Sequence, residues 1–141
     1  MKDSITIEQG SGGSAMMALI SELVLKNIKR QGGEGVTLGD LDDSGSIIAG
    51  EMEIVLTTDA HTVKPLFFPG GDIGALAAAG TLNDISVMGV KPLALSSSLV
   101  IEEGFPSSDL SRILGSMNVV LEEVGADHIH GATQVLGKGV V

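Results

Sequence analysis

The apolar and polar positions between residues 53 and 59 predict a buried strand that ends on an acid. Ile54, Val55 and Leu56 form a continuous apolar run between polar neighbours. A short apolar run of this kind, bounded by turn signals, is typical of a strand inside a sheet. The strand is predicted over Glu53 to Thr58, and Asp59 follows where the chain leaves the sheet.

A helix is predicted after the next turn, from Ile73 to Met88. Asp72 stands at its N-cap position, and Gly89 closes it as a C-terminal glycine does. Apolar and small residues dominate the helix, but Asn83 and Asp84 interrupt them. A carboxylate is rarely buried without a partner, because its desolvation costs several kcal/mol. Asp84 is therefore expected either at a rim or beside a positive group.

The C-terminal half alternates in a way that predicts a strand, a helix and a second strand. Pro92 to Ile101 has period two, with one semi-polar face, which indicates a strand that is only partly buried on that side. Ser108 is the expected N-cap of an amphipathic helix that stops at Gly125, and a strand carrying two histidines follows.

At the other end of the chain, Ile5 and Ile7 alternate with polar residues and predict a short first strand.

These elements predict an α+β fold in which a mixed sheet of about four to six strands has helices packed on one face. The 141 residues are expected to form one domain with its own core. The 43% apolar content excludes a disordered chain, and no apolar run is long enough for a membrane span. The N-terminus lacks the pattern of a signal peptide, so a cytoplasmic location is expected.

Charge and cysteine content narrow the chemistry. A formal net charge of −10 argues against general nucleic-acid binding, which relies on Lys and Arg. It does not argue against ATP, because a magnesium ion and glycine-loop amides can supply the positive field. The chain has no cysteine, so it contains neither disulfides nor a thiolate nucleophile.

Two acids are candidates for a metal site. Asp59 at the strand end and Asp84 on the helix would converge if the helix folds back onto the sheet. Magnesium prefers a few carboxylates together with phosphate oxygens and water. Each acid also has an ordinary alternative, because Asp59 suits a turn and Asp84 suits a solvated helix position.

Three further stretches are candidates for phosphate or metal contacts. Gly10, Gly12 and Gly13 form a loop that opens a helix, where backbone amides can hold phosphate, although a plain linker explains the loop equally well. Lys64 could reach a phosphate as a point charge, or could simply be solvated. The cluster that contains Asp42 and Asp43 is by default a solvated acidic turn.

The central stretch also resembles a known family. TTDAHTVKPLFFPGGDIG followed by GTLNDISVMGVKPLALS resembles the signature of the hydrogenase maturation factor HypE, of the aminoimidazole ribonucleotide (AIR) synthetase superfamily. IEQGSGGSAMMALI, LDDSGSI and IEEGFPSSDL resemble the glycine-rich opening, an acidic motif and a strand exit of that family, in the same order. The resemblance therefore covers nearly the whole chain.

The resemblance implies the N-terminal, ATP-binding domain of a HypE-like factor, which dimerises by joining sheets into a barrel. The full-length family member uses ATP to dehydrate a carboxamide on its own C-terminal cysteine to a thiocyanate, which supplies the cyanide ligands of nickel–iron hydrogenase. The family is more than twice as long, with a second domain and that cysteine tail, so residues 1–141 are expected to be incomplete at the C-terminal end and inactive alone. Other hydrogenase maturation proteins are the expected partners.

Site residues follow from the motif positions. The glycine-rich loop is a mobile lid over the nucleotide in this family, and an acidic residue before the first long strand faces the metal; Asp43 is favoured over Asp42. The expected ligands of Mg²⁺ are Asp43, Asp59 and Asp84. The expected ATP or phosphate contacts are Gly10, Gly12, Gly13, Lys64, Gly71, Asp72, Asn83 and Thr133.

One motif departs from the family. Where the family has Gly-Asp-Thr-Lys, this chain has Gly131, Ala132, Thr133 and Gln134, so both charged groups are missing. This loss favours an alternative, a non-catalytic dimerisation or interaction module with the same fold. A third alternative is another ATP-dependent kinase or synthetase of the superfamily, against which LFFPGGDIG and the absence of a reactive cysteine both count.

Overall fold

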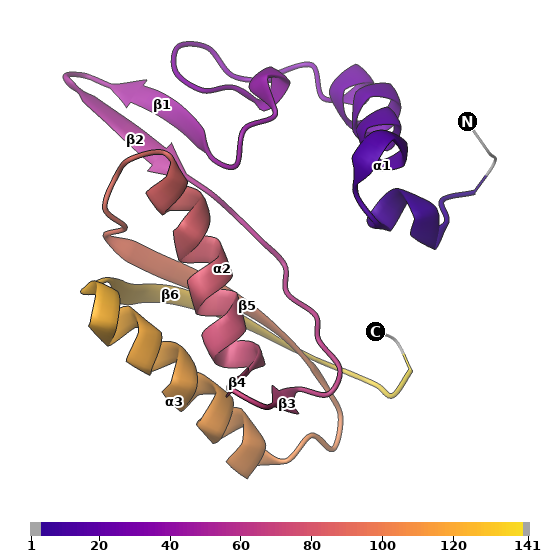
Figure 1. Cartoon of the computed structure of the whole chain (residues 1–141), viewed down its shortest axis with the longest axis vertical. Helices are drawn as coiled ribbons and strands as arrows, with labels where there is room; N and C mark the ends of the chain where they lie inside the picture. The colour runs from indigo at the N-terminus through magenta and orange to yellow at the C-terminus, as the bar shows by residue number, and fades with distance from the viewer. Residues whose placement is uncertain (1–3, 140–141) are drawn as a thin grey trace. The chain divides into compact units, whose positions relative to one another are not determined.

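The structure is a computed structural model that describes residues 4–139. The chain divides into two compact units, residues 1–55 and 56–141. Figure 1 shows the elements of both, and each unit is described by itself.

The first unit begins with short helical segments. These are η1 (Ile7–Gly10), α1 (Gly13–Leu19), the π-helical segment η2 (Ile20–Leu25) and η3 (Leu38–Asp40). The predicted strand around Ile5 and Ile7 is wrong, because Ile7 lies in a 3₁₀ turn. Thr6 and Gln9 close that turn with a reciprocal capping box, which satisfies backbone donors locally and leaves no extended segment.

A two-stranded sheet follows, made of β1 (Gly45–Ala49) and β2 (Met52–Leu56). The strand predicted over residues 53–58 is confirmed as β2, although it ends two residues early. The hydroxyl of Ser46 on β1 donates to Glu53 Oε1 on β2 at 2.5 Å, so a side-chain hydrogen bond also joins the two strands.

The second unit opens with a short pair of strands, β3 (Phe67–Phe68) and β4 (Gly71–Asp72), which leads directly into α2 (Ile73–Val87). The predicted N-cap is confirmed, because Asp72 accepts hydrogen bonds from the backbone N–H groups of Gly74 and Ala75. Gly89 follows the C-cap with φ 78°, a conformation that favours glycine. Local chemistry therefore defines both ends of this helix.

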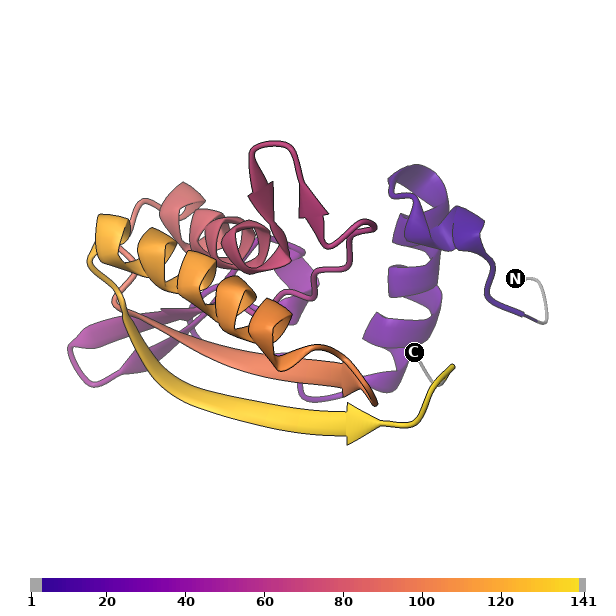
Figure 2. The ribbon, with the colours of Figure 1, turned by 90° about the horizontal axis from the view of Figure 1, so that it is seen from below.

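The rest of the second unit is a strand–helix–strand unit of β5 (Ala94–Glu102), α3 (Ser107–Val124) and β6 (Asp127–Leu136). The two strands pair in parallel, with a register shift where β6 contains an extra residue beside Leu95 and Ser96. Helices α2 and α3 cover one face of this pair (Figures 1 and 2). The core of the unit consists of Ala78, Leu82, Leu95, Met117, Leu121 and Ala126.

Two expectations need correction. The N-cap of α3 is Pro106 and not Ser108, so the helix begins two residues earlier than expected and has no side-chain cap. The described strands pair only two by two, in three separate sheets, where a single sheet of four to six strands was expected. Each observed pair is joined by a turn, a short loop or one helix, whereas a larger sheet needs a register between distant segments that local patterns do not specify.

The alternation predicted for residues 92–101 is confirmed along β5. Leu95 is buried on the side that the helices cover. Every second residue from Ala94 to Glu102 is exposed on the other side. The exposed face includes Val100, which is 54% exposed. In the part of the chain that the structure describes, no helix is long and apolar enough to cross a membrane.

Candidate functional site

The segment after β2 carries Asp59 and lies against α2, the helix that carries Asp84. The Thr57 hydroxyl donates to Asp84 Oδ2 at 3.2 Å. Four residues further along the segment, the imidazole of His61 lies against Gly80, where a Cβ built on that glycine would be only 2.3 Å from Nε2. Both contacts are within the second unit, and they join the segment to α2 at two points.

Asp59 lies between Thr57 and His61 in the sequence, and its carboxylate interacts with His61. Its Oδ2 is 3.1 Å from His61 Nε2, and its Oδ1 accepts a hydrogen bond from the backbone N–H of Ala60 at 2.8 Å. Gly80 and Asp84 are four residues apart and therefore lie on one face of the helix. The structure thus brings the segment of Asp59 to the same helix face as Asp84.

Whether these residues suit a magnesium ion follows from their chemistry. Among the described residues, no group of three or more His, Asp or Glu side chains could hold a metal by itself. Magnesium bound with a nucleotide needs only one or two carboxylates, because phosphate oxygens and water complete the octahedron. Asp59, whose side chain is 41% exposed, and the half-buried Asp84 fit that requirement.

Asp72 has a structural environment that the sequence did not reveal. It is only 4% exposed, and its Oδ1 accepts hydrogen bonds from Gly74, Ala75 and the hydroxyl of Ser116 on α3. Burial raises the pKa of this carboxyl, but the three hydrogen bonds and the nearby charge of Arg112 outweigh it, so the pKa lies below the ordinary value of 3.8. The amides at the start of α2 are therefore already occupied by a protein carboxylate.

The same face of α3 also contacts the aromatic residue that precedes this turn. The guanidinium carbon of Arg112 lies 4.3 Å from the ring centroid of Phe67, a cation–π contact. Arg112 and Ser116 are four residues apart, so one helix face binds both Phe67 and Asp72. The FFPGGD turn is thereby fixed to α3 by two side chains.

The remaining predicted residues of the second unit are exposed or part of the turn. Asn83 is exposed on α2, Lys64 is exposed before Pro65, and Thr133 is exposed on β6 opposite Leu99. Gly71 lies on β4, where a Cβ would be 3.3 Å from the Phe68 ring. Their proposed contacts with phosphate stay predictions.

The predicted glycines of the first unit lie at the end of η1 and the start of α1, and Asp43 lies in a bend before β1. Gly12 and Gly13 have φ of 80° and 65°, which favour glycine, and nothing lies within 4 Å of a Cβ built on them or on Gly10. The backbone N–H of Asp43 donates to Asp42 Oδ1 at 2.8 Å. Whether Asp43 binds a metal also stays a prediction.

Asp40, the third acid of that cluster, has a local structural role. Its Oδ2 accepts hydrogen bonds from the backbone N–H and the hydroxyl of Thr37 at 2.7 and 2.8 Å. The backbone hydrogen bond, followed by the hydroxyl, lowers the pKa of Asp40. The acidic cluster is therefore partly explained by the capping of η3.

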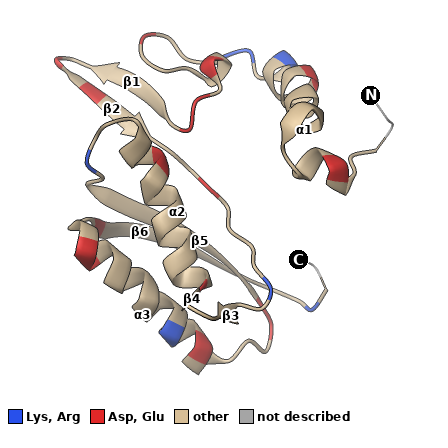
Figure 3. Cartoon of the chain, viewed as in Figure 1, with Lys and Arg blue, Asp and Glu red and all other residues tan. Residues whose placement is uncertain are grey.

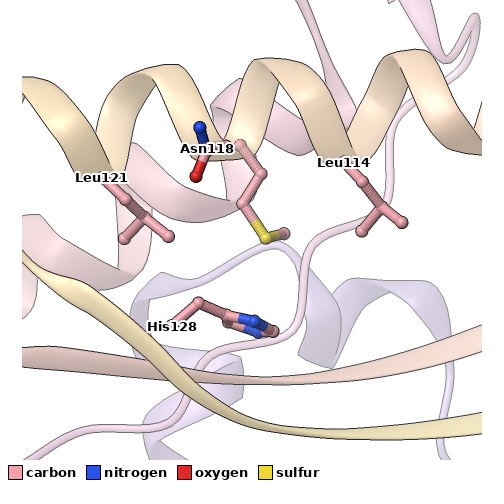
Figure 4. A pocket seen from close by; sticks show the side chains of 5 residues that line it. Leu114, Asn118, Leu121 and His128 are labelled. Atoms are coloured by element: carbon pink, nitrogen blue, oxygen red, sulfur yellow. The ribbon is translucent and has the colours of Figure 1, made fainter.

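A pocket lies elsewhere, between α3 and β6. Its volume is about 240 Å³, and its lining consists of Leu114, Met117, Asn118, Leu121 and His128 (Figure 4). His128 Nε2 is 3.0 Å from the hydroxyl of Ser97 on the neighbouring strand. None of the predicted site residues lines this pocket, and four of its five lining side chains belong to α3.

The charge distribution agrees with the composition. Figure 3 shows acidic residues on the β1–β2 hairpin, on loops and on helices, while the Lys and Arg residues of the described part are fewer, and three of them lie within residues 26–30.

The sequence missed the partners of the acids. Thr57 falls only within the strand predicted over Glu53 to Thr58, and His61 stands two residues after Asp59 with no predicted role. Their spacing of two residues on either side of Asp59 is the one signal that could have pointed to them, since alternate residues of an extended segment share a side.

Comparison with known proteins identifies a family that this chain matches. The profile described as AIR synthase related protein, N-terminal domain, matches residues 41–141. A protein of Methanocaldococcus jannaschii whose name refers to hydrogenase expression and formation is 52% identical over 132 residues, which are 93% of this chain and 39% of that protein. A carbamoyl dehydratase HypE of Cupriavidus necator is 42% identical over 135 residues, which are 96% of this chain and 37% of that protein.

Solved structures of HypE proteins also match this chain. A structure of a HypE–HypF complex matches with a TM-score of 0.75 and 44% identity over 88% of this chain and 38% of that one. A structure of HypE in complex with ATP matches with a TM-score of 0.58 and 36% identity over 98% of this chain and 39% of that one. The chain therefore spans about two fifths of the length of the curated relatives it matches.

Proposed function

This chain belongs to the AIR synthase related family, whose N-terminal domain it matches over residues 41–141, and from that premise we propose that it is the ATP-binding domain of a HypE-like hydrogenase maturation protein. The whole protein would be an ATP-dependent carbamoyl dehydratase, acting on a cysteine S-carboxamide. The solved HypE–ATP complex, which is similar over 98% of this chain, supports the nucleotide as ligand.

The observation that carries the proposal is the attachment of the Asp59 segment to the helix face of Asp84. The Thr57 hydroxyl orients one oxygen of Asp84, and His61 orients one oxygen of Asp59. Two carboxylates held in this way would bind Mg²⁺, and Lys64 and Asn83 of the same unit would contact phosphate. Asp72 would act indirectly, because it fixes the turn before α2.

When bound, Mg-ATP supplies a phosphoryl group that can be transferred to a carboxamide oxygen and so turn that oxygen into a leaving group. The role proposed for this chain is positioning. Asp59 and Asp84 would hold and orient the magnesium ion, and they perform no covalent step. Because the chain has no cysteine, the thiol that carries the carboxamide must belong to a different segment or chain.

Isothermal titration calorimetry with Mg-ATP tests the proposal. We expect micromolar binding by the wild type, weaker but measurable binding with excess chelator, and at least tenfold weaker binding by Asp84→Asn, which keeps the shape and removes the charge. Asp127→Asn, an exposed acid at the start of β6, is the matched control and should bind like the wild type. Absence of binding by the folded wild type contradicts the proposal.

A second candidate function is a non-catalytic interaction module. Ala132 and Gln134 favour it, since they replace the charged residues that the family resemblance places in this strand. The same titration separates the two candidates, because a module without a nucleotide site gives no heat with Mg-ATP at any concentration up to millimolar.

We also propose that the chain forms a homodimer and contacts other hydrogenase maturation proteins. The exposed apolar side chains of β5 and β6, Val100, Ile129 and Val135, are 54%, 70% and 66% exposed and would be covered by a second copy. The HypE–HypF complex supports contact with a second maturation protein. Sedimentation equilibrium of the wild type and of Val100→Lys tests the dimer, which the lysine should weaken. A wild type that is monomeric at roughly 100 µM contradicts the proposed dimer.

A further inference from the structure

The imidazole of His61 occupies a notch in α2 that only glycine can provide. A Cβ at Gly80 would lie 2.3 Å from His61 Nε2 and 3.0 Å from Cε1, closer than real Cβ atoms approach. Glycine within a helix costs roughly 1 kcal/mol relative to alanine. Helix α2 therefore carries a residue of low helix propensity at the turn where His61 contacts it.

The notch places a hydrogen-bond donor beside Asp59. The side chain of His61 is only 15% exposed, whereas that of Asp59 is 41% exposed, so the histidine is the more buried partner. Its Nε2 is 3.1 Å from Asp59 Oδ2, and because a carboxylate only accepts, the imidazole nitrogen donates. Helix α2, the imidazole and the carboxylate thus form a chain of contacts.

Asp59 still has capacity for a cation in this arrangement. Its Oδ1 accepts from Ala60 N–H and its Oδ2 from His61, which is one hydrogen bond for each oxygen. A carboxylate oxygen has two lone pairs, so each oxygen retains one. Carboxylates that bind metals are commonly held by such a second hydrogen bond, and loss of the donor typically weakens metal affinity 10- to 100-fold.

We propose that His61, seated against Gly80, is the positioning residue that holds Asp59 as a ligand of the magnesium ion. This inference rests on the proposed function and adds to it a residue that touches neither nucleotide nor metal. It also assigns a role to Gly80, whose missing side chain makes room for the imidazole. The histidine acts through Asp59 and takes no part in chemistry.

Four variants of the 141-residue chain test the proposal. His61→Ala removes the donor, and His61→Gln restores one at the place of Nε2. Gly80→Ala leaves the histidine in the sequence but displaces its ring from the notch. Gly115→Ala, on α3, is the matched control for a helix glycine, because nothing lies within 4 Å of a Cβ built there.

The measurement is the Mg²⁺ affinity of the ATP-saturated chain, with ATP affinity in excess chelator and the thermal midpoint recorded beside it. We expect His61→Ala and Gly80→Ala to weaken Mg²⁺ binding by about 10- to 100-fold, with little change in metal-free ATP affinity. His61→Gln should recover most of the loss, and Gly115→Ala should match the wild type. This separation of metal from nucleotide affinity is not expected from a general loss of stability.

The outcomes distinguish the two proposals. If the wild type does not bind Mg-ATP, the proposed function and the role of His61 both fail. If the wild type binds and Asp84→Asn does not, but His61→Ala binds Mg²⁺ as tightly as the wild type, only the role of His61 fails. It fails equally if His61→Gln is as impaired as His61→Ala, because shape and not the donated hydrogen bond would then matter.

Discussion

The hydroxyl of Ser116 on α3 donates a hydrogen bond to Oδ1 of Asp72, the N-cap of α2. The two residues are 44 positions apart in the sequence, so this bond joins the start of α2 to the middle of α3, two helices that pack side by side. The Ser116 hydroxyl oxygen also lies 2.9 Å from the backbone carbonyl oxygen of Ile113, so the one hydroxyl hydrogen is shared between two acceptors. One hydroxyl therefore links the cap of α2 to the backbone of α3.

The first prediction concerns pH. The folded pKa of Asp72 lies below its ordinary value of 3.8, so the folded state favours the ionised form. Its contribution to the free energy of unfolding is complete above the ordinary pKa and is lost as the pH falls through the lower, folded pKa. Urea unfolding of the wild type and of Asp72→Asn should therefore differ most at pH 5 to 7, roughly, and converge on acidification below pH 3.8. A difference that is constant or grows toward acid contradicts the assignment.

The second prediction concerns the packing of the two helices. A Cβ at Gly74 would lie 2.0 Å from the carbonyl oxygen of Ile113 on α3, and backbone cannot move aside easily. We expect Gly74→Ala to lower the free energy of unfolding by about 2 kcal/mol or more, as overpacked sites do. Gly115→Ala should instead be neutral or stabilising by up to about 1 kcal/mol, because it gains helix propensity without a clash. Chemical denaturation measures both, and equal effects would contradict this account.

The third prediction concerns the hydroxyl that orients Asp84. Thr57→Val keeps the shape of the side chain and removes the donor of the 3.2 Å hydrogen bond to Oδ2. A hydrogen bond to a charged group contributes about 1.5–3 kcal/mol when it is fully formed, and this half-buried one should contribute less. We therefore expect Mg-ATP to bind roughly three- to tenfold more weakly, by calorimetry.

Thr58→Val is the matched control for Thr57→Val, because Thr58 is exposed and next to it in the chain. It should bind Mg-ATP like the wild type. If the two valine variants bind equally well, the Thr57 hydroxyl has no part in holding Asp84.

The fourth prediction concerns the motif on β6 that departs from the family. Ala132 and Gln134 are exposed and pair with Ser98 and Val100, so Ala132→Asp and Gln134→Lys should leave the fold intact. The family resemblance assigns metal–nucleotide contacts to these charges, and we expect the double variant to bind Mg-ATP about tenfold more tightly, which corresponds to about 1.4 kcal/mol. Unchanged affinity, with an unchanged thermal midpoint, would show that this strand does not reach the nucleotide.

Local patterns located the helices well and the first strand badly. Asp72 and Gly89 define the ends of α2 through caps that involve only neighbouring residues, so sequence spacing was enough to find them. Ile5 and Ile7 had the alternation of a strand, but Thr6 and Gln9 offered a competing local set of hydrogen bonds, which formed instead. Two alternating residues are too few to decide between a strand and a capped turn.

The candidate site divides in the same way. The acidic character of Asp59 and Asp84, and their positions at a strand exit and on a helix, were evident from the order of residues alone. Their partners were not, because Thr57 and Asp84 are 27 positions apart and His61 meets α2 only where Gly80 lacks a side chain. Hydrogen bonds between such distant residues depend on how the segment crosses the helix.

By itself, the sequence determined the family, the helices with their caps, the alternation along β5 and the acidic residues that suit a cation. Only the tertiary structure decided that the strands of the described chain pair two by two, that Asp72 is buried beneath Ser116, and that His61 lies against Gly80 beside Asp59. The physical reason is range: caps and periodicity act within a few residues, whereas these contacts arise when packing of the apolar core fixes α2, α3 and the segment after β2 against one another.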